Sequence, residues 1–487
     1  MSLNTPLFLF IFLPVALLLH LVVGKKARNS VLILASLVFL VFCDPLFFPL
    51  LLAMVLLNYL FGLSMASTSI TPKKPWGILI FILVLNIGLL LAFKIVTAYY
   101  PQFSQLLLAS LPGFALTTNR ITLIGRYLLM PVGLSFFTFQ VLSYQIDVYK
   151  GVIKAEKNLL HFGLHLLMFP RLIAGPIMHF GEIDPQLHER SINFNNLGNG
   201  ARRFVRGLGK KTLIADQLIP LDQGIFSLTS ALISTPVAWL SLLAFSLRIY
   251  FDFSGYTDMA LGIGEMLGFR FAENFNYPYI SRNLSEFWRR WHMTLSAWFR
   301  EYVFYPLERQ RRGRAGLSQT INILIVFTLT GLWHGVTLNF ILWGLFQGII
   351  ISLETLGLAT FLKKQKVPFQ HIYALVMIAI SWLIFASPSP EFTLQYLLSL
   401  SGLQGNTQFL SFYSFPPIQP QTWIALAAGL LLSLPLLPRM AQEINNRWPS
   451  QEKTVLIIGD IILFGVLILS LLVIANSTFH AYIYGRF

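Results

Sequence analysis

The sequence has few charged residues, and that shortage excludes a soluble fold. Asp, Glu, Lys and Arg make up 11% of the 487 residues, whereas soluble globular proteins carry about 25%. Hydrophobic residues make up 55%, and the mean hydropathy is +0.68. The apolar runs are about 20 residues long and do not alternate with polar residues, which favours helices over a barrel. The sequence therefore predicts an all-α polytopic membrane protein.

Cysteine is almost absent, and so are the common motifs of soluble hydrolases. The one cysteine, Cys43, excludes a disulfide framework and a cysteine-ligated metal site. Neither an H-E-x-x-H pattern nor a G-x-S-x-G motif occurs. Histidines 161, 165 and 179 form a loose group, but we find no nearby Cys, Asp or Glu to complete a ligand set. We therefore expect no bound metal.

Positive charge is abundant and unevenly placed. The formal net charge is +15, and most of the 35 Lys and Arg residues lie in short clusters between apolar runs. Clusters of this kind set the orientation of a membrane protein, and one topology puts seven of them inside. It places both termini outside. No separate soluble domain is left to bind nucleic acid.

The apolar runs predict a single integral membrane domain over residues 1–487, with roughly 11–13 hydrophobic elements. Residues 158–178 should form a bent or re-entrant element, because Pro170 and Gly175-Pro176 interrupt the run between two basic loops. Residues 387–421, which lack Lys and Arg, should form an external loop. The other predicted spans are 6–23, a hairpin over 31–63, 77–98, 127–147, a hairpin of 237–252 and 254–268, a hairpin of 319–334 and 339–358, 369–386, 423–437 and 455–475.

His334 is the first candidate for chemistry. It ends the apolar stretch 321–333, and Gly331 and Gly335 would let another backbone or a substrate approach closely. Ionisable groups inside membranes are often functional, although a hydrogen-bonded packing histidine fits the position equally well. Burial disfavours the imidazolium, so His334 should be neutral and available as a general base.

His292 lies in a segment rich in Trp and Arg. At helical spacing Trp288, Trp291, His292 and Leu295 share one face, which predicts an amphipathic helix at the membrane interface. The segment is either an interfacial anchor or a basic platform for an anionic donor. Elsewhere, Arg248 and Asp252 are four residues apart and can pair.

Six stretches between about residues 130 and 345 resemble the membrane-bound O-acyltransferase (MBOAT) family, in the branch of alginate O-acetylation (AlgI) and teichoic acid D-alanylation (DltB) proteins. They are GLSFFTFQ at 133–140, FPRLIAGPI at 169–177, YFDFSGYTDMA at 250–260, NFNYPY at 274–279, the segment 287–306 and GLWHG at 331–335.

The resemblance implies a helical bundle around a funnel, with His334 and His292 at the family's two characteristic histidines. It implies transfer of an acyl group, most simply acetyl, from a cytosolic acyl-CoA or acyl carrier protein thioester to hydroxyls of an external polysaccharide. The reaction needs no bound cofactor. The resemblance also implies the bacterial cytoplasmic (inner) membrane and an extracytoplasmic SGNH or hydrolase-like partner. Candidate residues for binding donor or substrate are Asn276, Trp288, Arg289, Arg290, Trp291 and Trp333.

Three alternatives stay open. Within the family, the chain could transfer D-alanine from a carrier protein to teichoic acid. A membrane transporter with broken helices is the alternative from another class, although the two halves of the chain show no internal similarity. A scaffold for exopolysaccharide export is the third, and it predicts that His334 is dispensable.

Overall fold

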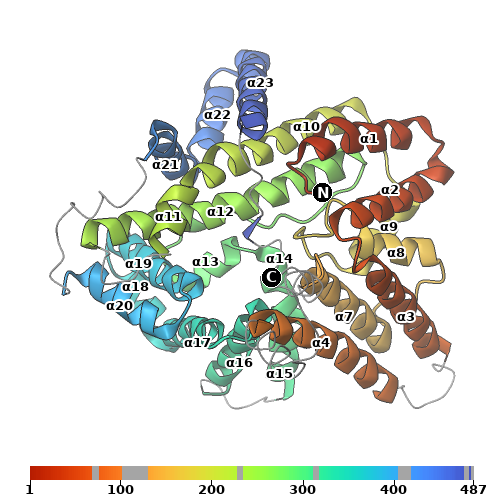
Figure 1. Ribbon diagram of the computed structural model, residues 1–487, viewed down its shortest axis with the longest axis horizontal. Coiled ribbons are helices and arrows are strands. Elements are labelled where there is room, and N and C mark those ends of the chain that lie inside the picture. Colours follow the sequence, from red (N-terminus) through yellow and green to blue (C-terminus); the bar gives the residue numbers. More distant parts are fainter. Residues whose placement is uncertain are drawn as a thin grey trace, which may run out of the picture. The chain divides into compact units, whose positions relative to one another are not determined.

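The computed structural model describes residues 1–67, 76–100, 130–226, 234–310, 317–403, 418–476 and 482–483. Every regular element in these residues is a helix (Figure 1). Seven of the described helices are long and apolar enough to cross a membrane, and a bent helix pair would make an eighth. The prediction of an all-α polytopic membrane protein is confirmed, while the funnel remains a prediction.

The chain divides into two compact units. The N-terminal unit lies within Met1–Gly198 and Ile263–Ala272, and the C-terminal unit within Asn199–Gly262 and Glu273–Ile483. The helices of the N-terminal unit are α1 (Leu13–Val22), α2 (Arg28–Cys43), α3 (Phe48–Ser67), α4 (Trp76–Ala98), α7 (Leu134–Lys150), α8 (Leu159–Leu167) and α9 (Phe180–His188). The chain breaks between Cys43 and Phe48, as predicted, but α2 and α3 do not pack on each other as a hairpin, since α2 packs on α8 and α3 packs on α7. The first residues of the predicted span 127–147 lie outside the described residues.

The bent element over 158–178 is also confirmed. Helix α8 ends at Leu167, the backbone is non-helical until α9 begins at Phe180, and the side chains between Phe162 and Met178 are buried. Gly133 helps to admit this segment, because a Cβ there would lie 2.1 Å from the carbonyl oxygen of Leu172. Irregular backbone is therefore packed inside protein, as its unpaired polar groups require.

The predicted hairpin of 237–252 and 254–268 is wrong. The structure has one 32-residue helix, α12 (Thr235–Met266), whose length is clear in Figure 1. The predicted pair of Arg248 with Asp252 is wrong as well. Arg248 binds Asp222 of α11 (Ile219–Phe226), and Lys211 lies 2.7 Å from Asp252. Arg248, Asp252 and Asp258 of α12 are each paired with a residue of a neighbouring segment, and the helix continues past the polar residues that suggested a turn.

The rest of the C-terminal unit follows the predicted spans more closely. Helices α16 (Leu317–His334) and α17 (Leu338–Leu353) confirm the predicted hairpin, and α19 (Val367–Ala386) and α23 (Glu452–Asn476) match predicted spans. Helix α20 (Pro390–Ser401) lies within the predicted external loop. Helices α21 (Pro420–Leu432) and α22 (Leu436–Arg447) are bent by 54° relative to one another. The orientation of the termini remains a prediction.

Candidate functional site

His334 is the last residue of α16 and is held in a ring of aromatic side chains. Its imidazole centroid lies 4.4 Å from that of Trp333 and 5.0 Å from both Trp343 of α17 and Phe385 of α19. Phe340 stacks at 6.3 Å. His334 is only 4% exposed. Apolar surroundings of this kind favour the neutral imidazole that a general base requires.

The two glycines beside His334 act as predicted, by letting α17 approach α16. A Cβ on Gly331 would lie 2.3 Å from the carbonyl oxygen of Phe340, and one on Gly335 would lie 2.3 Å from the Phe340 ring. Gly344 of α17 meets α16 in the same way, since its Cβ would lie 2.3 Å from the carbonyl oxygen of Phe327. The close crossing brings the rings of α17 within contact of His334.

His292 does not lie on a continuous helix, and the amphipathic helix predicted through it is wrong. Helix α13 (Leu284–Arg290) ends before it, and α14 (Met293–Phe299) begins after it. His292 itself has φ +43°, in the left-handed region, so the helix cannot pass through this residue. The four residues expected to share a face are nonetheless all buried: Trp288, Trp291, His292 and Leu295.

Asn274 orients the His292 ring, a role that sequence reasoning assigned to no residue. The Asn274 Oδ1 lies 3.1 Å from His292 Nδ1 and also accepts hydrogen bonds from the amide and hydroxyl of Thr294. The Thr294 amide can only donate, which identifies the facing Asn274 atom as the carbonyl oxygen. Because that oxygen can only accept, His292 Nδ1 is the donor. Burial lowers the pKa of His292 to about 3. The neutral ring therefore carries its proton on Nδ1, and Nε2 bears the lone pair.

In the structure His334 and His292 both lie against the indole ring of Trp333. The Trp333 ring lies 4.4 Å from that of His334 and 6.2 Å from that of His292. The two histidines are 42 residues apart in sequence, on α16 and at the α13–α14 corner. Trp333 was a candidate residue from sequence, and its ring contacts both histidine rings.

A buried hydrogen-bond network connects Trp288 to the aromatic ring around His334. The Trp288 indole donates to Gln347 Oε1 at 3.1 Å, and the Trp343 indole donates to Ser381 Oγ at 2.9 Å. Gln347 Nε2 donates to the same serine oxygen. The Trp288 and Trp343 rings also pack at 5.9 Å. Gln347 and Ser381 could not be predicted from the sequence, because isolated polar residues on apolar helices look like packing residues.

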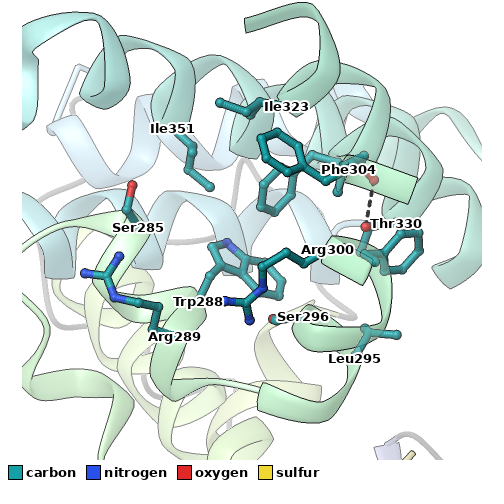
Figure 2. Close-up of a pocket in the computed structure, with 13 residues that line it drawn as sticks. Ser285, Trp288, Arg289, Leu295, Ser296, Arg300, Phe304, Ile323, Thr330 and Ile351 are labelled. Carbon is teal, nitrogen blue, oxygen red and sulfur yellow. Dashed lines mark hydrogen bonds between the residues drawn. The ribbon is translucent and has the colours of Figure 1, made fainter. Parts of the chain in front are cut away.

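Trp288 and Arg289 line a cavity of about 200 Å³ (Figure 2). Figure 2 shows Trp288 near the centre, with Arg300 reaching toward it from the right, Arg289 at the left, and Ile323 and Ile351 above. The remaining lining is largely apolar. A cavity with apolar walls and two guanidinium groups suits a ligand with an apolar arm and an anionic end.

The other candidate residues have different surroundings. Arg290 binds Glu286 at 2.9 Å and faces a separate cavity of about 570 Å³, which Arg282 and Arg439 also line. Trp291 is 1% exposed and packs on Phe275, Phe287 and Trp382. Asn276 is exposed, and its carbonyl oxygen accepts from Arg290. Trp291 and Asn276 therefore support the α13 corner from outside the cavity around Trp288.

One expectation about histidines needs correction. His161 does have carboxylates nearby in space: Glu156 and Asp184 lie beside it together with His188. Asp184 and His188 belong to α9, and local sequence around His161 could not reveal them. His165 and His179 lie outside this group.

The helices define a multi-pass membrane protein, and its candidate site contains two buried histidines. Comparison with known proteins then gives its family. Residues 153–398 match the model of MBOAT, the membrane-bound O-acyltransferase family, and the chain belongs to this family. It is an acyltransferase.

Its relatives include polymer-modifying enzymes from bacteria. The chain is 36% identical over 388 residues to a probable alginate O-acetylase AlgI of Pseudomonas putida, covering 79% of this chain and 77% of the relative. It is 33% identical over 440 residues to a peptidoglycan O-acetyltransferase of Helicobacter pylori, covering 82% and 80%. A teichoic acid D-alanyltransferase of Streptococcus thermophilus is 31% identical over 258 residues, covering 48% and 58%.

Proposed function

We propose that this protein moves an acetyl group from a cytosolic thioester to hydroxyls of a cell-surface or secreted polysaccharide. The observation that carries the proposal is the pair of buried histidines around Trp333, one of them inside a ring of aromatic side chains. Relatives named as alginate and peptidoglycan O-acetylating enzymes favour a polysaccharide acceptor.

His334 is the general base in this proposal. Its neutral imidazole takes the proton of the acceptor hydroxyl as the oxygen attacks the thioester carbonyl. The C–S bond then breaks, and the thiolate leaves with the proton that His334 holds. Base catalysis of this kind contributes about 10²–10⁴-fold, and the reaction requires no metal.

His292 positions a reactant. Its Nε2 is the acceptor atom of the neutral ring, because Asn274 fixes the proton on Nδ1. A lone pair aimed by a buried amide can hold the hydroxyl of an acceptor, or a water that relays its proton, at a defined angle. The strained backbone at His292, with φ +43°, fits a residue retained for such a role.

The donor binds in the cavity beside Trp288. Arg289 and Arg300 are suited to phosphate oxygens of coenzyme A or of a carrier protein's prosthetic arm, and the apolar walls are suited to the arm itself. The Trp288 ring packs on Trp343, which packs on His334. This sequence of contacts joins the donor cavity to the proposed base.

The proposal places the protein in a bacterial cytoplasmic membrane, with a hydrolase-like extracytoplasmic protein as partner. Transfer of D-alanine to teichoic acid is the second candidate, and the D-alanyltransferase relatives support it over a shorter part of the chain.

The test is chemical analysis of the surface polymer from cells with and without the gene. Mild alkali releases ester-linked acids, which chromatography then identifies. We expect acetate that disappears with the gene while the amount of polymer is unchanged. Release of D-alanine instead would select the aminoacyl candidate. Loss of the polymer itself, or no change in ester, would overturn the acyltransfer proposal in favour of export or scaffolding.

A further inference from the structure

Four side chains with metal-binding chemistry meet in the N-terminal unit, outside the acyltransfer site. They are Glu156, His161, Asp184 and His188, and one ligand atom from each lies within 4.8 Å of all the others. Glu156 precedes α8, His161 lies in its first turn, and Asp184 and His188 are one turn apart on α9. Three separate parts of the chain therefore bring their donor atoms to one point.

Two of these donor atoms are buried and have no hydrogen-bond partner among the described residues. His161 Nδ1 and Asp184 Oδ1 are inaccessible to solvent and form no hydrogen bond with the described residues. A buried polar atom without a hydrogen bond is unfavourable, so a cation that contacts both atoms would be stabilising. The nearest contacts are ionic in type: His188 Nε2 lies 3.4 Å from Asp184 Oδ1, and His161 Nδ1 lies 4.0 Å from Glu156 Oε2.

We propose that Glu156, His161, Asp184 and His188 bind a divalent transition-metal ion of the zinc type. Two imidazoles and two carboxylates form a four-coordinate ligand set that zinc accepts, with bonds of about 2.0–2.2 Å. Tetrahedral bonds of that length place ligand atoms about 3.4 Å apart, which is the separation already present between His188 and Asp184. The other donors close in by a small movement, and the two carboxylates neutralise the charge of the ion.

The surrounding hydrogen bonds show how the site would adjust. Glu156 Oε1 accepts from the Asn158 amide at 2.6 Å, which leaves Oε2 for the metal. Asn29 Nδ2 donates toward His161 Nε2 at 3.2 Å, while its Oδ1 accepts from Arg190. A His161 bound through Nδ1 carries its proton on Nε2, so the Asn29 amide must turn to present its oxygen.

The local charges both favour and oppose the ion. Glu156 and Asp184 favour the ion, because each places a carboxylate beside the two imidazoles. Arg190 opposes the ion, because its guanidinium lies against Asn29. The metal would fasten the chain before α8 to α9, on either side of the buried non-helical segment 168–178. Its role is structural, and it does not depend on the proposed acyltransfer.

The test is metal binding by the full-length protein, purified in detergent without a histidine tag and stripped with a chelator. Zn²⁺ or Co²⁺ is added, excess is removed, and bound metal is measured by mass spectrometry and by the visible absorption of Co²⁺. We expect about one ion per chain, a tetrahedral Co²⁺ spectrum, and a Tm that rises with Zn²⁺.

Matched variants locate the ion. His161→Ala and His188→Ala should lose at least tenfold in affinity, whereas His371→Ala, in the C-terminal unit, should bind as the wild type does. Asn29→Asp should bind about tenfold more tightly, because a carboxylate accepts from His161 Nε2–H. Equal binding by wild type and both site variants, or no binding above the chelated baseline, would overturn the proposal.

Discussion

At the scale of single residues, the two histidines reach the same indole by different local means. His334 lies at the end of α16 and is surrounded by aromatic rings. His292 has a left-handed backbone conformation, and Asn274 orients its ring. Sequence spacing identified both histidines. It could not identify Asn274, because the contact joins residues 18 apart that are separated by helix α13.

The buried, neutral His292 should make folding stability depend on pH. Its pKa is about 3 in the folded protein and about 6.5 in an unfolded chain. Below pH 6.5 the unfolded chain takes up a proton that the folded protein refuses, so stability falls as pH falls. The loss at pH 5 is about 2 kcal/mol.

His292→Asn is the matched variant, because asparagine tolerates left-handed backbone and still donates to Asn274. Thermal unfolding in detergent should show a smaller drop in Tm between pH 7 and pH 5 for this variant than for the wild type. Equal drops would mean that another group governs the pH dependence.

The orienting role of Asn274 gives a second residue-scale prediction. Asn274→Asp keeps an oxygen for Thr294 and His292 but adds a negative charge, which raises the pKa of His292. We expect the variant to fold and to lose acyl transfer on the acid side of its pH profile, at a higher pH than the wild type. An unchanged profile would show that His292 does not need to be neutral.

At the scale of elements, the crossing of α16 and α17 holds the site together. The sequence predicted this hairpin because two apolar runs, 319–334 and 339–358, follow one another with a short break between them. It failed at α12, where paired charges inside one long helix resembled the polar residues of a turn. The prediction of one helix through His292 was also wrong, because a periodic pattern of side chains cannot reveal a residue with left-handed backbone.

Gly344→Ala should separate the two helices. Its Cβ would lie 2.3 Å from the backbone oxygen of Phe327, so α17 must move, at a cost of about 1–3 kcal/mol. We expect a lower Tm in detergent and reduced acyl transfer. The control is Gly459→Ala in α23, where a Cβ meets nothing within 4 Å and helix propensity improves by about 1 kcal/mol. Similar melting of both variants would contradict the close crossing.

At the scale of the whole molecule, composition was the most informative signal. A charged fraction of 11% indicates that the chain folds in a membrane. The motifs between about residues 130 and 345 indicate the family. The cluster of Glu156, His161, Asp184 and His188 could not be predicted, because packing of α9 against the chain before α8 assembles it.

The donor cavity gives a prediction about the enzyme as a whole. Arg289→Gln and Arg300→Gln should each raise the KM for the acyl donor about tenfold with little change in kcat, because a hydrogen bond to a charged group contributes about 1.5 kcal/mol. Added salt should raise KM less in the variants than in the wild type. Arg270→Gln, in the N-terminal unit, is the control. A fall in kcat at unchanged KM would place the arginines outside donor binding.

The central claim is that His334 removes the proton of the acceptor hydroxyl. The direct measurement is ester-linked acetate per unit of surface polymer in cells that produce wild type or His334→Gln at equal membrane abundance. Gln preserves size and polarity but cannot accept the proton, so we predict a loss of at least 100-fold. Ester content within a few fold of wild type would contradict the assignment of His334 as the base.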